Sequence, residues 1–190
     1  MKKSLLAMII LSTAAFGANP GGKVPTAGQE KGEVGVPMEV RVTVLPQGPQ
    51  LVLLDENDVL INKLTFDHGS MVAGLSKKST LEKEVRLARA DGKAFGSNAE
   101  TYKAKFEAKD LNGNAIAGDG SKNLTLNGHG AASGKTVDST LNYRNDEIAV
   151  TAKDKMVMTK VTSIIDAIPA GKEPGLYVGS GTFNATLTMD

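Results

Sequence analysis

Apolar and polar residues alternate strictly over one stretch near the amino terminus, residues 34–45. The apolar positions lie two residues apart, and they are Val34, Val36, Met38, Val40, Val42 and Val44. Side chains two residues apart point to the same face of a β-strand, so the pattern predicts a strand with one fully apolar face. Pro37 lies within this segment, and because proline lacks an amide hydrogen we expect the strand to pair incompletely along one side.

The remainder of the chain consists of short apolar segments separated by Gly, Asn and Asp turns. Strands are expected at residues 51–54, 59–66, 102–108, 124–126, 137–143, 148–152, 156–165 and 182–189. As a helix, residues 80–90 would place Leu81, Val85 and Ala88 on one face. As a strand they would place Leu81, Val85 and Leu87 together, and we predict a strand there. This punctuation predicts an all-β sandwich or barrel without a long helix.

The first 17 residues have the organisation of a secretory signal peptide. Lys2 and Lys3 precede an apolar run at residues 5–11, a small-residue stretch follows at residues 12–15, and Ala15 and Gly17 occupy the small-residue positions before the cleavage site. The run is shorter than the about 20 apolar residues that span a bilayer. We therefore expect the chain to be exported after cleavage behind Gly17.

Three further segments are expected in the exported chain. Residues 18–33 contain four glycines and two prolines and show no apolar periodicity, which predicts a flexible leader. Residues 34–45 form the alternating strand, and residues 46–190 form the folded domain.

The composition excludes several functions. The 190 residues include no cysteine, which excludes disulfides, thiol nucleophiles, Cys-ligated zinc and iron-sulfur clusters. The chain carries 22 basic and 21 acidic residues, and loss of Lys2 and Lys3 leaves 20 basic residues. Nucleic-acid binding needs a clearer basic excess, so no nucleic-acid partner is expected. An exported domain without disulfides depends on a good core or on burial against a partner chain.

Two segments superficially resemble ligand loops. Residues 128–136 end in Gly-Lys-Thr, but His129 stands where a phosphate loop requires glycine, so a surface hairpin is expected. Residues 110–114 begin like a calcium loop, but Ala115 and Ser121 occupy the positions that require glycine and glutamate. Their Asn-Gly pair is more typical of a hairpin turn.

His68 and His129 are the two histidines of the chain, and each lies beside a glycine in an expected turn. No motif of a metal site or of a nucleophilic hydrolase accompanies them. We therefore expect exposed turn histidines, no catalytic residue, no metal site, no cofactor and no enzymatic activity.

The alternating strand allows two interpretations. It is either an ordinary first strand of its own domain, or a strand that inserts into the sheet of a neighbouring molecule, where its side chains fill the pockets of a groove. Burial of each large apolar side chain contributes about 1.5–3 kcal/mol before ordering costs. Insertion could therefore compensate for the missing disulfides.

The two ends of the chain carry a family resemblance. Residues 39–44, followed by residues 51–55 and 63–66, have the layout of a pilin amino-terminal region, and Gly175-Leu-Tyr177 precedes an alternating final strand, as in fimbrial subunits. In these features the chain resembles the pilins of chaperone-usher fimbriae. It is most similar to the colonisation-factor antigen pilins of the alpha, or class 5, group.

The resemblance implies an incomplete immunoglobulin-like β-sandwich that is completed by donor-strand exchange. It assigns the donor strand to Val34, Val36, Met38, Val40, Val42 and Val44. It assigns the acceptor groove and the chaperone contact to Phe183, Ala185, Leu187 and Met189. The implied partners are identical pilin subunits in a homopolymer, a periplasmic chaperone, an outer-membrane usher and a tip adhesin. The implied location is an extracellular fimbria that supports cell adhesion and virulence.

Two other functions compete with this one. The alternative is a self-contained secreted β-sandwich that binds carbohydrate or another small ligand. A secreted hydrolase ranks third, because the sequence offers no nucleophile or metal constellation for it.

Overall fold

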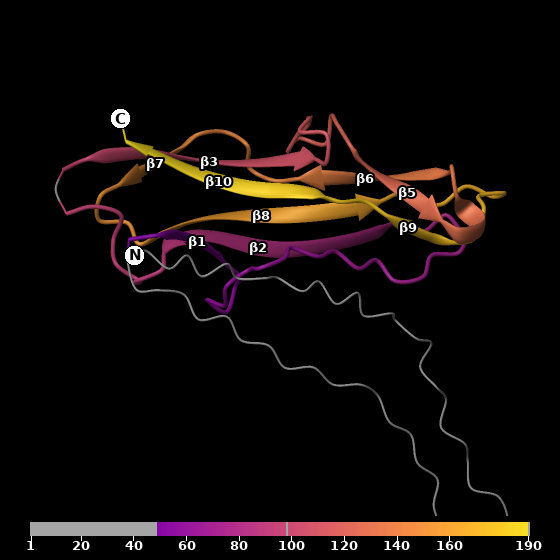
Figure 1. The fold of residues 1–190 in the computed structure, drawn as a ribbon, viewed down its shortest axis with the longest axis horizontal. Coiled ribbons are helices and arrows are strands. Elements are labelled where there is room, and N and C mark those ends of the chain that lie inside the picture. The colour runs from indigo at the N-terminus through magenta and orange to yellow at the C-terminus, as the bar shows by residue number, and fades with distance from the viewer. Residues whose placement is uncertain (1–48, 98, 190) are drawn as a thin grey trace, which may run out of the picture. The chain divides into compact units, whose positions relative to one another are not determined.

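A computed structural model describes residues 49–97 and 99–189, which form an all-β domain (Figure 1). Its strands are β1 (Leu51–Leu54), β2 (Ser79–Arg89), β3 (Thr101–Asp110), β4 (Ala115–Ile116), β5 (Leu124–His129), β6 (Thr136–Asn142), β7 (Ile148–Thr151), β8 (Met156–Ile165), β9 (Leu176–Val178) and β10 (Gly181–Met189). The predicted signal peptide, leader and donor strand, residues 1–17, 18–33 and 34–45, lie outside the described residues.

The strands form two antiparallel sheets. The larger sheet has six strands in the order β1-β2-β8-β6-β5-β9. In the smaller sheet β3 is central, with β10 along one edge and the short strands β4 and β7 along the other. The long strands β2, β8, β3 and β10 run along the same axis, and the β5–β6 hairpin lies at one end of the domain (Figure 1).

The hydrophobic core lies between the two sheets because each long strand turns alternate side chains inward. On β8 every second residue is buried, from Val157 to Ile165, and the residues between them are more exposed. The fully buried side chains include Val85 and Leu87 of β2, Phe106 of β3 and Val161 of β8. The predicted all-β sandwich is therefore confirmed, and residues 80–90 form a strand, as predicted.

The predicted strand at residues 59–66 is wrong. Leu60 makes a single bridge to Leu54, and the chain then continues without regular strand pairing as far as β2. The physical reason lies in the spacing, because Ile61 and Leu64 are three residues apart and cannot share one strand face. We call residues 60–78 the strap, and it runs alongside β2 as the violet coil in Figure 1. β4 and β9 were not predicted either, because at two and three residues they carry no periodic signal and form only by pairing with β3 and β5.

A buried tyrosine ties the two sheets together. The hydroxyl of Tyr143 donates a hydrogen bond to the carbonyl oxygen of Ile116 at 2.6 Å and accepts one from the amide of Ala108 at 2.9 Å. Its ring meets the ring of Phe183 edge to face, with the centroids 5.3 Å apart. Burial raises the pKa of Tyr143 above its ordinary value. Tyr143 follows β6, so one side chain joins the larger sheet to β3, β4 and β10.

We predict that Tyr143→Phe destabilises the domain by about 1–3 kcal/mol, because the substitution keeps the ring but leaves a buried amide and a carbonyl without their shared partner. Urea unfolding of the full chain, compared between wild type and variant in the same chaperone-bound or chaperone-free state, measures the effect. Tyr177→Phe is the matched control, since the Tyr177 hydroxyl bonds the carbonyl oxygen of Glu173 at an exposed site. The control should change stability by less than about 0.5 kcal/mol. Equal effects of the two substitutions would contradict the role given to Tyr143.

Candidate functional site

β10 lies at an edge of the smaller sheet. It pairs with β3 over its whole length, from Gly181 opposite Asp110 to Met189 opposite Tyr102. Among the strands in the described part of the chain, β10 has no other partner. The second edge of a strand carries amide and carbonyl groups that can pair with a further strand. β10 is therefore the place where the smaller sheet can be extended.

The side chains on the inner face of β10 are covered less well than their neighbours on β3. Phe183, Ala185 and Leu187 are half-buried and pack against the core. Across the ladder they stand opposite Ala108, Phe106 and Ala104, which are 3%, 0% and 0% exposed. Inward-facing side chains of this sheet are therefore buried on the central strand β3 and more exposed to solvent on the edge strand β10. The structure brings these three predicted groove residues together on one face.

Met189, the fourth predicted groove residue, is 62% exposed. It stands opposite Tyr102 in the last pair of the β3–β10 ladder and therefore lies at the edge of the core. The anchored end of the row is Phe183, whose ring lies 6.0 Å from that of Phe106 and edge-on to Tyr143. The predicted donor side chains, Val34 to Val44, lie outside the described residues.

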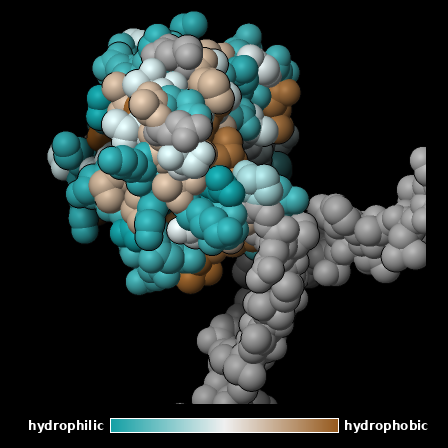
Figure 2. Space-filling model, turned by 90° about the vertical axis from the view of Figure 1, so that its left-hand side faces the viewer, coloured by the Kyte–Doolittle hydropathy of each residue, from teal (hydrophilic) through white to brown (hydrophobic). Residues whose placement is uncertain are grey.

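A second row of half-buried apolar side chains belongs to β1 and the strap. These residues are Leu53, Ile61, Leu64 and Phe66, and they pack against the same core cluster as β10 does. The core is therefore incompletely covered by two segments that are far apart in sequence. Sequence reasoning missed this second row, although the apolar residues at 61, 64 and 66 could have indicated it. At the end of the domain shown in Figure 2, brown apolar residues appear in separate places among teal hydrophilic ones.

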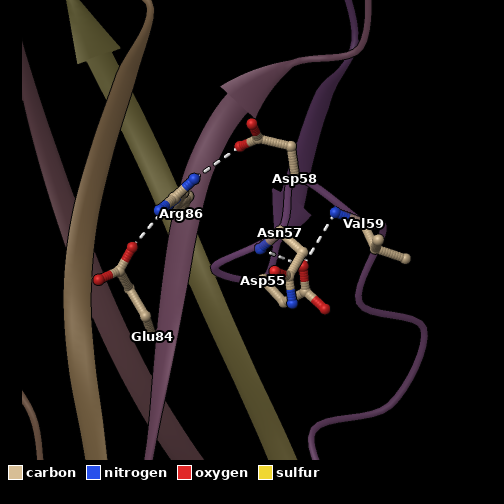
Figure 3. A network of polar contacts seen from close by, with 6 residues as sticks. All are labelled: Asp55, Asn57, Asp58, Val59, Glu84 and Arg86. Atoms are coloured by element: carbon tan, nitrogen blue, oxygen red, sulfur yellow. Dashed lines mark hydrogen bonds and ion pairs between the residues drawn. The ribbon is translucent and has the colours of Figure 1, made fainter.

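A tight turn fixes the start of the strap. The Oδ1 atom of Asp55 accepts hydrogen bonds from the amides of Asn57 and Val59, both at 2.9 Å (Figure 3). Asp58 adopts a positive φ of 60°, which a short side chain such as aspartate tolerates better than most. The turn also brings the amide of Ile61 to the carbonyl oxygen of Leu53, at 2.8 Å.

Arg86 attaches this turn to β2. Its guanidinium contacts Asp58 at 2.7 Å and Glu84 at 2.6 Å, so it joins a carboxylate of the turn to one of the strand (Figure 3). The hydrogen bonds that the guanidinium donates to Glu84 and Asp58 raise the pKa of Arg86. Charge-assisted hydrogen bonds of this kind are stronger than neutral ones. The turn is therefore held by Asp55 from within and by Arg86 from β2.

The prediction that His68 is an exposed turn residue is wrong. The imidazole is half-buried, with Nδ1 2.8 Å from the hydroxyl of Ser79 on β2 and Nε2 2.9 Å from the hydroxyl of Ser163 on β8. Ser163 in turn lies 2.8 Å from the hydroxyl of Ser139 on β6. Burial lowers the pKa of His68, and the charge of Asp67 opposes that effect. No local pattern in the chain indicates this network, because 95 residues separate His68 from Ser163.

The other loops agree with their predictions. Residues 128–136 join β5 to β6 as a hairpin that includes the short 3-10 turn Gly130–Ala132. His129 is exposed, as predicted, but it is the last residue of β5 and pairs with Leu176 of β9 instead of lying in the turn. At the β3–β4 turn, Oδ1 of Asp110 accepts from the amides of Asn112 and Asn114, both at 2.8 Å. That carboxylate caps the turn itself, as predicted for a hairpin rather than for a calcium loop.

Within residues 49–97 and 99–189, no three or more His, Asp or Glu side chains gather closely enough to hold a metal ion. The same residues include no helix with the length and apolar character needed to cross a membrane.

We predict that Asp55→Ala increases amide hydrogen exchange at Asn57 and Val59, because both amides lose their carboxylate acceptor. A loss of about 0.5–1.5 kcal/mol for each bond corresponds to exchange faster by about 2- to 12-fold. Glu56→Ala is the control, since Glu56 is exposed in the same turn. Unchanged exchange in Asp55→Ala would show that the carboxylate does not hold the turn.

Comparison with protein families and with curated proteins does not assign the chain. No protein-family model matches it, and the search of curated proteins finds no significant match.

Proposed function

We propose that this chain is a structural subunit of a surface fimbria, which polymerises by donor-strand complementation and supports cell adhesion. In this proposal residues 34–45 of one subunit lie along β10 of the next. The observation that carries the proposal is the loss of cover across the smaller sheet, where Phe183, Ala185 and Leu187 are half-exposed beside fully buried residues of β3.

An added strand would satisfy both needs of this edge. Its main chain can continue the ladder of the smaller sheet, and its alternate side chains can cover the apolar row beneath. The predicted strand at residues 34–45 has the required pattern, with an apolar side chain at every second position from Val34 to Val44. Each side chain that becomes buried contributes about 1.5–3 kcal/mol before the costs of ordering.

The proposal includes the partners that such an edge requires. A strand with one unpaired edge and with half-exposed apolar side chains invites aggregation, so a periplasmic chaperone covers β10 before assembly. An outer-membrane usher then exchanges the chaperone for the donor strand of the next identical subunit. In this proposal a tip adhesin ends the fibre. The nearly balanced charge, 22 basic against 21 acidic residues, allows subunits to stack without strong repulsion.

We predict that a chain lacking residues 18–45 accumulates as a chaperone-bound monomer and forms no fibre, because the acceptor edge remains while the donor is gone. Electron microscopy of cells that express the whole assembly system, with antibody labelling, measures the result. Full-length subunits should be labelled along the fibre. Fibres formed by the truncated chain would contradict the donor assignment. A full-length chain that stays a stable monomer without a chaperone, and unfolds cooperatively, would instead favour the self-contained ligand-binding sandwich.

A matched pair of substitutions tests the side-chain pattern of the donor. We predict that Val40→Asp abolishes polymerisation, because it places a charge on the buried face of the donor strand. Arg41→Asp, on the opposite face, should leave fibre yield within about 2-fold of the wild type, since its side chain points away from the acceptor. Fibre yield by sedimentation and microscopy compares the two. Equal loss of fibres in both variants would contradict the alternation that we propose.

A further inference from the structure

The middle of the strap depends on one side chain for its polar attachment to the sheet. At one end of the strap Ile61 bonds Leu53, and near the other end the amide of Gly74 donates to the carbonyl oxygen of Ile168, at 2.8 Å. Between these points, residues 63–71 make no backbone–backbone hydrogen bond to another described residue, and the amide of Gly69 bonds the carboxylate of Asp67, which belongs to the strap itself, at 2.9 Å. His68 lies in this interval, and it bonds strands on both sides of its ring.

The hydroxyl chain behind His68 enters the sandwich. Ser139 and Ser163 are each 3% exposed, and they lie on the inner faces of β6 and β8. A neutral imidazole has one donor and one acceptor nitrogen. When Nε2 accepts, Ser163 can donate to it and Ser139 can donate to Ser163, so both buried hydroxyl hydrogens have acceptors. The neutral form therefore fits the chain.

The protonated imidazole fits less well. Both of its nitrogens must donate, so neither serine can give its hydroxyl hydrogen to the ring. Ser163 and Ser139 can still share one hydrogen bond, in either direction. The remaining hydroxyl hydrogen then loses its acceptor within the chain, and a buried donor without a partner costs about 1–3 kcal/mol. Protonation of His68 in this network therefore requires the hydroxyls to rearrange, whereas protonation of an imidazole in water does not.

The charges around the ring do not remove this penalty. β2, β8 and β6 present uncharged hydroxyls to the network, from Ser79, Ser163 and Ser139. Asp67 on the strap favours the cation, but burial has the larger effect on the pKa of His68 and lowers it. His68 also lines a cavity of about 250 Å³ together with Lys77 and Lys78. Both lysines are positively charged, as a protonated imidazole is, so they do not favour protonation of His68.

We propose that His68 is a pH-sensitive clasp, which holds the strap on the sandwich when neutral and releases it when protonated. Release takes up one proton, so the attachment is complete above the ordinary histidine pKa of about 6.5 and weakens as the pH falls below that value. The opening equilibrium of the strap rises by at most about tenfold per pH unit, because one proton is taken up. Release would also uncover Leu64 and Phe66, which precede His68 on the strap and pack on the core. This clasp does not depend on the proposed function.

Hydrogen exchange of the full chain, read by mass spectrometry between about pH 7.5 and pH 5, tests the clasp across the range in which histidine titrates. Exchange at the imidazole carbon reports the pKa of each of the two histidines, and we expect that of His68 to be below about 6.5. Amide exchange in residues 60–78, corrected for its intrinsic pH dependence, should rise as the pH falls. A His68 pKa at or above about 6.5, or strap exchange independent of pH, would overturn the proposal.

Two substitutions assign the effect to one residue. His68→Gln removes the titration but keeps an amide donor and acceptor, so the pH response of the strap should disappear. His129→Gln changes an exposed histidine and should leave the response as in the wild type. A response that survives in His68→Gln would overturn the proposal. If that variant does not fold, the exchange of wild-type His68 and of the wild-type strap still decides the matter.

Discussion

The other features of this structure depend on the hydrophobic core between the two sheets. Side chains at the centre of this core are fully buried, whereas those at its margin remain partly exposed to solvent. Phe106 and Val161, on opposite sheets, are fully buried, whereas the row from Phe183 to Leu187 on β10 is only half-buried. Burial of the apolar surface that water still reaches would favour association with another chain. In a chain without cysteine no disulfide can hold this margin, so it must be held by side-chain contacts or by another strand.

Two polar devices hold the margin from inside the domain. The Tyr143 hydroxyl bridges Ala108 and Ile116, and its ring supports Phe183, so it fixes β10 against the core. His68 holds the middle of the strap through Ser79 and Ser163. In both, the neutral side chain forms hydrogen bonds with buried polar groups. The two differ in their response to pH, because tyrosine stays neutral across the physiological pH range whereas histidine titrates within it.

The turn that begins at Asp55 shows how a local feature positions a distant one. Its carboxylate closes the turn, and Arg86 fastens Asp58 to β2. The strap therefore leaves β1 in a fixed direction, with Ile61 and Leu64 against the core. The strap and β10 pack against the same core cluster from two segments that are far apart in sequence. Under the proposed function, the donor strand of a neighbouring subunit would lie along β10 and cover part of that cluster.

The sequence by itself determined the all-β class and the position of most strands, because period-two alternation is a local property that any strand with one buried face must show. It also placed Phe183, Ala185 and Leu187 on one face. The spacing of Ile61 and Leu64 already disfavours a regular strand at residues 59–66, but only the tertiary structure showed that the chain leaves the ladder after Leu60 pairs with Leu54. Only it could bring His68 to Ser163, because contacts between residues 95 positions apart leave no periodic trace in the chain.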